Sequence, residues 1–272
     1  MIGLLRAEWM KAIRQGTNLA LVATVIGVAV LEACLVLYTA TGGNGIPGGT
    51  ALLGGKLGFP NGFLLPLGEI GALAMLIATI FVATVIGSEY TTDTWKNMLI
   101  RYPGRGRFLV AKLAAVGFAL VTAVGAAMII SQALMLAGQA VFAGNATLAA
   151  LKVVPLSANA FWSQLWQDTV PLALTLAPAA GVAALFTILG RSTVAGILLG
   201  IVWQTADSLL GQLLPSIAGF LVNPNINSLT RNLVKPGSGQ FDQWQSVGVL
   251  VLYALVPTLV AIFIFRKRDI AG

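Results

Sequence analysis

The sequence contains no histidine, a single cysteine and very little charge. Charged residues make up 9% of its 272 positions, whereas a water-soluble chain carries about 25%. Without histidine, and with one cysteine, the chain has no internal disulfide framework and is a poor candidate for a zinc or haem centre. Its net charge of +7 is too scattered to form a nucleic-acid-binding face. These absences exclude an ordinary soluble enzyme, a disordered tail and a nucleic-acid binder.

Long apolar stretches are what the sequence has instead, since 57% of its residues are hydrophobic. A helix needs about 20 apolar residues to cross a hydrocarbon core of about 30 Å. Six stretches meet that requirement, at 19–38, 66–87, 112–142, 169–189, 193–214 and 246–265. The sequence therefore predicts an all-α membrane protein with six transmembrane helices in a single domain over residues 1–272.

The distribution of Lys and Arg predicts the orientation of these spans, because basic connections stay on the cytoplasmic side. Twelve basic residues fall at the two termini and in the connections after the second and fourth spans. Four fall in the remaining connections, at Lys56, Lys152, Arg231 and Lys235. Both termini are therefore expected to be cytoplasmic, in a multi-pass protein of the plasma (inner) membrane.

Three segments outside the spans have apolar character of their own. Residues 1–16 place Ile2, Leu5 and other apolar side chains on one helical face, which predicts an amphipathic interfacial helix. The alternative is a plain charged flank of the first span. The apolar pieces 148–156 and 213–222 are too short to span. We interpret both as interfacial or re-entrant helices, the second within an external loop at 215–245.

The connection between the second and third spans, residues 88–111, carries the most specific pattern. Thr92 can cap a helix, with Asp93 near its positive end, and Pro103 follows shortly after the expected stop near Arg101. Trp95, Met98 and Leu99 lie three and four residues apart, on one face of such a helix. The pattern predicts a short cytoplasmic helix that exposes these aromatic and aliphatic side chains to the cytoplasm.

This connection resembles that of ABC-2 type transporter permeases, in the group of antibiotic and lantibiotic self-protection exporters. These permeases show G-x-E-Y-x-x-G-T-x-K/R-x-x-L after the second span, then P-x-R and an A-K pair entering the third. The matching positions are Gly87, Glu89, Tyr90, Thr94, Lys96, Leu99, Pro103, Arg107, Ala111 and Lys112. Asp93 replaces the usual Gly, and Gly104 and Gly106 leave the spacing to Arg107 ambiguous. The resemblance is specific over about 26 residues. Over the rest of the chain it is limited to the topology of six spans with cytoplasmic termini.

The resemblance implies a non-catalytic membrane subunit in a bacterial ABC exporter. A separate ATPase subunit, in two copies, would bind ATP and Mg²⁺, so no cofactor is expected in this chain. The short helix would couple the subunits by docking on that ATPase through Glu89, Thr94, Trp95, Met98 and Leu99. Further partners would be a second permease copy or a homologous permease, and membrane lipid. The competing interpretation is a membrane-surface amphipathic turn in an unrelated protein.

Polar residues inside the predicted spans suggest a translocation path. A carboxylate at bilayer depth costs on the order of 3 kcal/mol, so it usually faces a cavity, a partner or a proton path. Glu32 and Asp207 are such residues, and Gln132, Gln139 and Gln204 could hydrogen-bond to them. Glu69 fits simple placement at the interface. Gly196 and Gly200, spaced as GxxxG, favour close helix packing within the chain over a dimer contact.

Two other classes of function compete with the exporter. A secondary transporter or channel could use Glu32 and Asp207 as proton or ion sites, but it would favour charged or broken helices in symmetric halves, which the sequence lacks. A membrane-embedded enzyme ranks third, because no metal cluster or pair of nucleophile and base is present.

Overall fold

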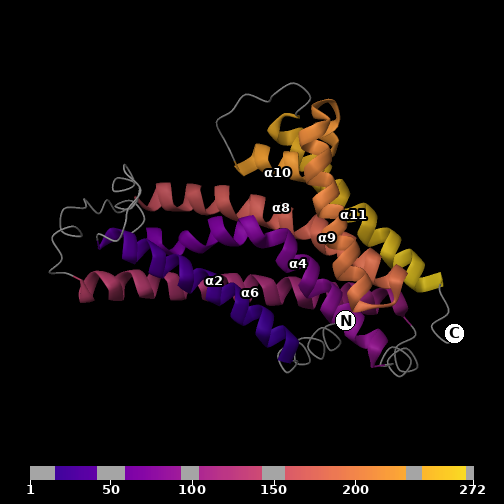
Figure 1. Ribbon diagram of the computed structural model, residues 1–272, viewed down its shortest axis with the longest axis horizontal. Coiled ribbons are helices and arrows are strands. Elements are labelled where there is room, and N and C mark those ends of the chain that lie inside the picture. Colours follow the sequence, from indigo (N-terminus) through magenta and orange to yellow (C-terminus); the bar gives the residue numbers. More distant parts are fainter. Residues whose placement is uncertain (1–15, 42–58, 93–103, 143–156, 231–240, 268–272) are drawn as a thin grey trace. The chain divides into compact units, whose positions relative to one another are not determined.

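The structure is a computed structural model, and it describes residues 16–41, 59–92, 104–142, 157–230 and 241–267. Within these ranges every regular element is helical (Figure 1). The long helices are α2 (Gly16–Ala40), α4 (Leu65–Thr91), α6 (Arg105–Val141), α8 (Ala158–Gly190), α9 (Thr193–Leu213) and α11 (Gln243–Lys267). Shorter elements are η1 (Asn61–Phe63), η2 (Pro215–Phe220) and α10 (Val222–Thr230).

Among the described residues, six helices are long and apolar enough to cross a membrane, which confirms the predicted all-α fold with six helices able to span. Each corresponds to one of the six stretches found in the sequence. The amphipathic helix expected at 1–16 and the apolar piece at 148–156 lie outside the described residues.

The helix ends differ from the predicted spans, because helices continue beyond the apolar core. α8 begins at Ala158, eleven residues before the predicted 169, and it contains Pro171 and Pro178 without ending. α6 begins at Arg105 instead of 112, and α4 continues to Thr91 instead of ending at 87. Most of these extra turns carry polar or charged side chains, which a search for charge-free stretches leaves out.

The helices pack into two compact units, and several of them contribute residues to both. Unit 1 contains the described residues 16–21, 73–92, 104–119, 171–230 and 241–267. Unit 2 contains 22–41, 59–72, 120–142 and 157–170. In unit 2, α2 packs on α6 through a cluster that includes Ala33, Val36 and Met135. Leu37 lies so close to Gly138 that a Cβ there would overlap it.

α10 is packed among the spanning helices of unit 1 and is not a surface loop. Its residues Val222 and Leu229 are buried in a cluster with Met75 and Ala78 of α4, Ala179 of α8 and Leu250 of α11. Figure 1 shows α10 beside α9 and α11, and it contacts both helices. The expected interfacial or re-entrant piece at 213–222 is the end of α9 and the turn η2, and α10 follows it.

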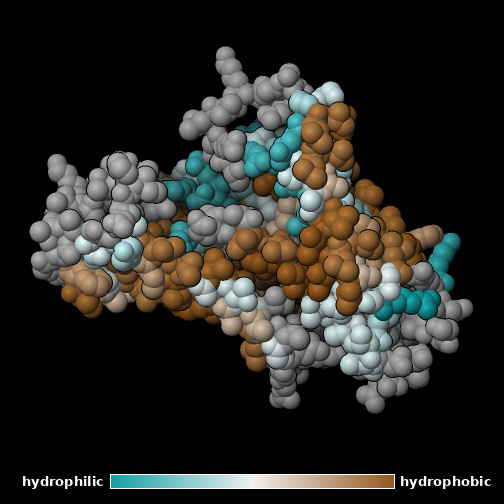
Figure 2. Space-filling model, viewed as in Figure 1, coloured by the Kyte–Doolittle hydropathy of each residue, from teal (hydrophilic) through white to brown (hydrophobic). Residues whose placement is uncertain are grey.

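Glycines allow α9 to approach its neighbours in unit 1. A Cβ on Gly200 would lie 2.5 Å from Thr79 Cγ2 of α4, and one on Gly196 would lie 2.9 Å from Ala83 Cβ of the same helix. The GxxxG pair therefore packs helices within the chain, as the sequence favoured. Elsewhere on its surface, α9 exposes Val194, Leu198 and Val202, and brown apolar surface lies over α9 and α11 in Figure 2. Apolar surface of this kind fits contact with lipid.

Candidate functional site

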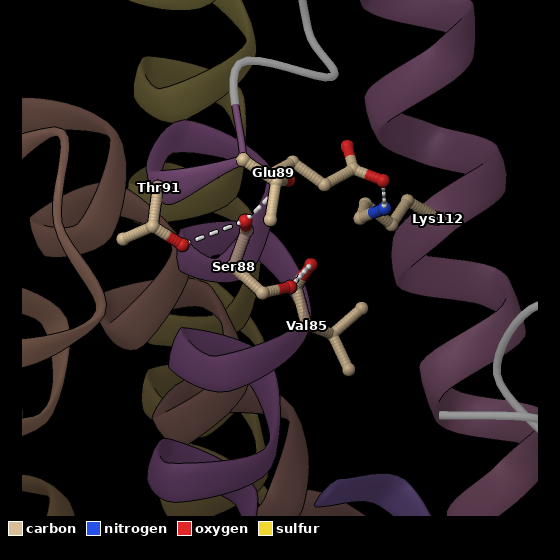
Figure 3. A network of polar contacts seen from close by, with 6 residues as sticks. Val85, Ser88, Glu89, Thr91 and Lys112 are labelled. Carbon is tan, nitrogen blue, oxygen red and sulfur yellow. Dashed lines mark hydrogen bonds and ion pairs between the residues drawn. The ribbon is translucent and has the colours of Figure 1, made fainter. Parts of the chain in front are cut away.

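A buried ion pair joins the end of α4 to the start of α6, the two helices that flank residues 93–103. Lys112 Nζ donates to Glu89 Oε1 at 2.6 Å, and the two side chains are 2% and 1% exposed. Figure 3 shows the pair bridging the two helices. The sequence had placed both residues in the family motif, but not in contact. Removing one partner of a buried pair is strongly destabilising, because the other charge is left without compensation.

The last turn of α4 is closed by its own hydroxyl groups. Thr91 Oγ1 and Thr92 Oγ1 each donate to the Ser88 carbonyl oxygen at 2.8 Å, and Thr92 N donates to the same oxygen at 3.1 Å. Figure 3 shows the bond from Thr91. Carbonyls in the last turn of a helix lack intrahelical partners, and these bonds supply them. The helix therefore ends in a defined turn at Thr91, two residues after Glu89.

Lys112 is held from its own helix as well. Its Nζ lies 5.6 Å from the centre of the Phe108 ring, one turn earlier in α6. The Phe108 side chain is 1% exposed. A cation over an aromatic face is attracted electrostatically, and the attraction grows when water is excluded. Glu89 and Phe108 together fix the position of the ammonium group.

Gly87 brings α4 against the first residue of α9. A Cβ at this position would lie 2.5 Å from Thr193 Cα and 2.6 Å from Thr193 N. Both distances are too short for a non-bonded Cβ contact, so no side chain fits here. Ser192 caps α9 by accepting from Val194 N at 3.2 Å, and Arg191 adopts a positive φ of 49° in the turn before it. The glycine of the motif is therefore required for close backbone packing.

The residues predicted to dock on an ATPase fall mostly outside the described part of the chain. Tyr90 is half-buried in α4, and Arg107 is exposed in α6. The structure describes the two ends of the predicted coupling segment as helix, at 88–91 and 105–111. Four of the five predicted docking residues, Thr94, Trp95, Met98 and Leu99, lie in the undescribed range 93–103, and so do the motif residues Lys96 and Pro103.

Asp207 has backbone partners that the sequence did not reveal. Its Oδ1 accepts from Val222 N at 2.9 Å and its Oδ2 accepts from Asn223 N at 2.7 Å. Val222 and Asn223 open α10, whose preceding residue Leu221 has no polar side chain to cap it. Asp207 of α9 therefore caps α10, and its negative charge lies at the positive end of that helix.

Gln204 is bonded to α4 and not to the Asp207 carboxylate. Its Nε2 donates to Thr79 Oγ1 at 2.6 Å and to the Met75 carbonyl at 3.1 Å. The Gln204 carbonyl oxygen accepts from Asn223 Nδ2 at 3.3 Å. Gln204 thereby ties α9 to α4 and, through its backbone, to α10.

Glu32 is buried in unit 2, at 9% exposure. Gln132, which the sequence suggested as a partner, does not bond to it, because neither polar atom of the Gln132 side chain has a partner within the described residues. Gln132 instead lies against η1, where a Cβ on Gly62 would be 2.9 Å from its Oε1. Nothing in the described ranges places Glu32 and Asp207 in one site, and the side chain of Glu69 is not described.

Metal ligation has no candidate within the described residues, where no three His, Cys, Asp or Glu side chains are grouped. Among the described residues, the polar network at the α4–α6 connection includes one carboxylate, one ammonium group and the hydroxyls that close α4. These contacts hold the ends of the two helices in place, so we treat this region as a positioning site.

Comparison with known proteins yields a family without an assigned activity. No curated protein matches the chain. A family model matches residues 67–271, a range that begins in α4 and contains the Glu89–Lys112 pair, α9, α10 and α11. That range covers well over half of the sequence, so the chain belongs to the family described as "Protein of unknown function (DUF2705)".

Proposed function

We propose that the protein is the membrane-spanning permease subunit of an ATP-driven ABC exporter, which moves an amphipathic peptide, drug or lipid. The observation that carries the proposal is the buried Glu89–Lys112 pair. Both residues belong to the motif that resembles the permease pattern, and they lie 23 positions apart on either side of the expected docking helix.

The pair gives a physical means of transmitting force. A docking helix transmits motion to spans only if its two ends are attached firmly to those spans. Glu89 and Lys112 connect α4 to α6 close to the two helix ends that flank residues 93–103. Gly87 adds a backbone contact to the start of α9. A push on the segment would therefore reach three helices of unit 1 at once.

The contacts of Asp207 favour the exporter over a secondary transporter. Intramembrane carboxylates that serve proton relays or ion pathways face the bundle interior or a water-filled cavity. Both Asp207 oxygens are engaged by backbone N–H groups of α10, which suits a capping role. Glu32, in unit 2, remains a candidate for lining the path.

The proposal assigns ATP and Mg²⁺ to a separate ATPase present in two copies, and it pairs this chain with a second permease. The complex would lie in the plasma membrane with both permease termini cytoplasmic. Affinity purification of the full-length tagged chain from native membranes tests this directly. We expect a nucleotide-binding ATPase to copurify in a fixed ratio and the isolated chain to hydrolyse no ATP. Transport by the purified single chain without ATP would contradict the proposal.

A further inference from the structure

Three basic side chains at one end of unit 1 have no counter-charge among the described residues. Arg107 lies in the first turn of α6, and Arg266 and Lys267 lie in the last turn of α11. All three are exposed, and none makes an ion pair within the described ranges. Glu89 is already bonded to Lys112, and Asp207 accepts from the backbone of α10. Within this part of the chain, positive charge is therefore in excess where the two helices meet.

The two helix ends are in direct contact. A Cβ on Gly106 would lie 3.1 Å from Arg266 Cδ and 3.4 Å from Ile262 Cγ2. The absence of a side chain at Gly106 lets the stem of Arg266 lie along the first turn of α6. Arg107 follows Gly106 directly in the sequence, so three exposed cations lie at or next to this contact, and we refer to them as one basic surface.

This basic surface continues an exposed apolar stripe on α11. Leu252, Val256, Leu259 and Phe263 are each more than half exposed and are separated by four, three and four residues, which places them on one helical face. Arg266 and Lys267 follow three and four residues after Phe263, which places them on the same side of the helix. Lys267 Nζ lies 4.4 Å from the centre of the Phe263 ring, directly at the end of the stripe. Figure 2 shows the brown surface over α11 giving way to teal where the helix ends.

The dimensions of the stripe fit one leaflet of a bilayer. Eleven residues separate Leu252 from Phe263, which is about 16 Å at about 1.5 Å per residue. Half of a hydrocarbon core of about 30 Å is about 15 Å. An acyl chain lying along the stripe would therefore bring its headgroup to the level of Arg266 and Lys267.

We propose that the α6–α11 end is a binding site for an anionic phospholipid. Its phosphate and negative headgroup contact Arg107, Arg266 and Lys267, and its acyl chain covers the apolar stripe. Any lipid could cover the stripe, so the selectivity for negative charge comes from the three exposed cations. This inference is independent of the exporter proposal, because it uses only the contacts of α6 and α11.

Native mass spectrometry of the full-length protein, purified from vesicles with equal amounts of phosphatidylglycerol and phosphatidylcholine, tests the site. We expect phosphatidylglycerol to be retained in preference. Arg107→Gln and Arg266→Gln should each lower that preference by about five-fold, from the energy that one cation contributes near an anionic surface. Arg266→Lys should keep most of it, because the charge remains. Arg191→Gln is the matched control, since Arg191 lies in the turn between α8 and α9.

A second arm separates a lipid site from a simple phosphate site. Glycerol phosphate, added at the same molar concentration as the phosphatidylglycerol, should not displace the lipid, because it lacks the acyl chain that covers the stripe. Displacement by this soluble anion would overturn the proposal. Unchanged lipid preference in the double Arg107→Gln, Arg266→Gln variant would also overturn it, provided that size-exclusion chromatography shows the variant folded.

Discussion

Lys112 donates to Glu89 across the gap between α6 and α4, and both charges are shielded from solvent. The residues lie at positions that the sequence had marked by motif alone. Their contact explains why an acid and a base are placed at the ends of adjacent apolar helices, where a single charge would be costly. The pair joins the two helix ends that flank residues 93–103.

Removal of one partner should destabilise the bundle strongly. Lys112→Met leaves the Glu89 carboxylate buried without its cation, which is expected to lower the free energy of unfolding by about 3 to 5 kcal/mol. Replacing both residues, as Glu89→Gln with Lys112→Met, should recover part of that loss because no isolated charge remains. Thermal unfolding of the detergent-purified variants measures this. Equal stability of Lys112→Met and the unmodified protein would rule out a strong pair.

Gly87 should tolerate no side chain, whereas Gly117 should. Gly87→Ala forces a Cβ into the backbone of Thr193, so α4 and α9 must separate. At Gly117 in α6 an added Cβ would meet nothing within 4 Å, and alanine favours helix by up to about 1 kcal/mol over glycine. We expect Gly87→Ala to lower the unfolding midpoint and Gly117→Ala to leave it unchanged or raise it. The same response to both substitutions would contradict the close packing.

Asp207 should hold α10 in its packed position. Asp207→Ala leaves two backbone N–H groups of α10 without their acceptor, at a cost of about 1 to 3 kcal/mol. Labelling of a cysteine at buried Leu229 by maleimide, in full-length protein lacking Cys34, reports whether α10 has been released. We expect faster labelling with Asp207→Ala and an intermediate rate with Asp207→Asn, which keeps one acceptor.

A cysteine at Trp244, which is 85% exposed, provides the control for that experiment and should react at one rate in every background. If Leu229→Cys reacts with maleimide no faster after Asp207→Ala, the capping bonds do not hold α10 in its packed position. Asp207 would then regain its place as a candidate for the translocation path.

The predicted topology can be checked without knowing the function. In intact cells, single cysteines at Lys56 and Ser238 should react with an impermeant maleimide, and cysteines at Asn97 and Asp269 should not. The expectation rests on the twelve-to-four split of basic residues. Labelling of the second pair and protection of the first would invert the orientation.

The sequence predicted the spans well, because hydrocarbon thickness and apolar length are properties of local sequence. Helix ends were less predictable. α8 begins early and passes through Pro171 and Pro178, since neither proline nor polar composition alone ends a helix that packing supports. The GxxxG pair was interpreted correctly, because small residues four apart have a direct geometric consequence.

Long-range polar contacts could not be predicted in the same way. The motif marked Glu89 and Lys112 as important, yet only folding shows that the two side chains meet. Asp207 was assigned to a path because a buried carboxylate is costly, and its backbone partners in α10 lie fifteen and sixteen residues away. No local pattern indicates that a residue of one helix will cap another.

Under the proposed function, residues 93–103 dock on a separate ATPase through Trp95 and Leu99. Burial of a large apolar side chain is worth about 1.5 to 3 kcal/mol. Trp95→Ala with Leu99→Ala should therefore weaken the affinity for the ATPase by about one to two orders of magnitude. Asn97→Ala, in the same segment, is the matched control and should change little.

Copurification of the ATPase with the full-length chain, together with ATP hydrolysis by the purified complex, measures this effect most directly. We expect the double variant to reach the membrane in normal amounts, to retain little ATPase and to show no coupled hydrolysis, whereas Asn97→Ala should retain both. Full retention of the ATPase and of coupled hydrolysis in the double variant would contradict docking through Trp95 and Leu99.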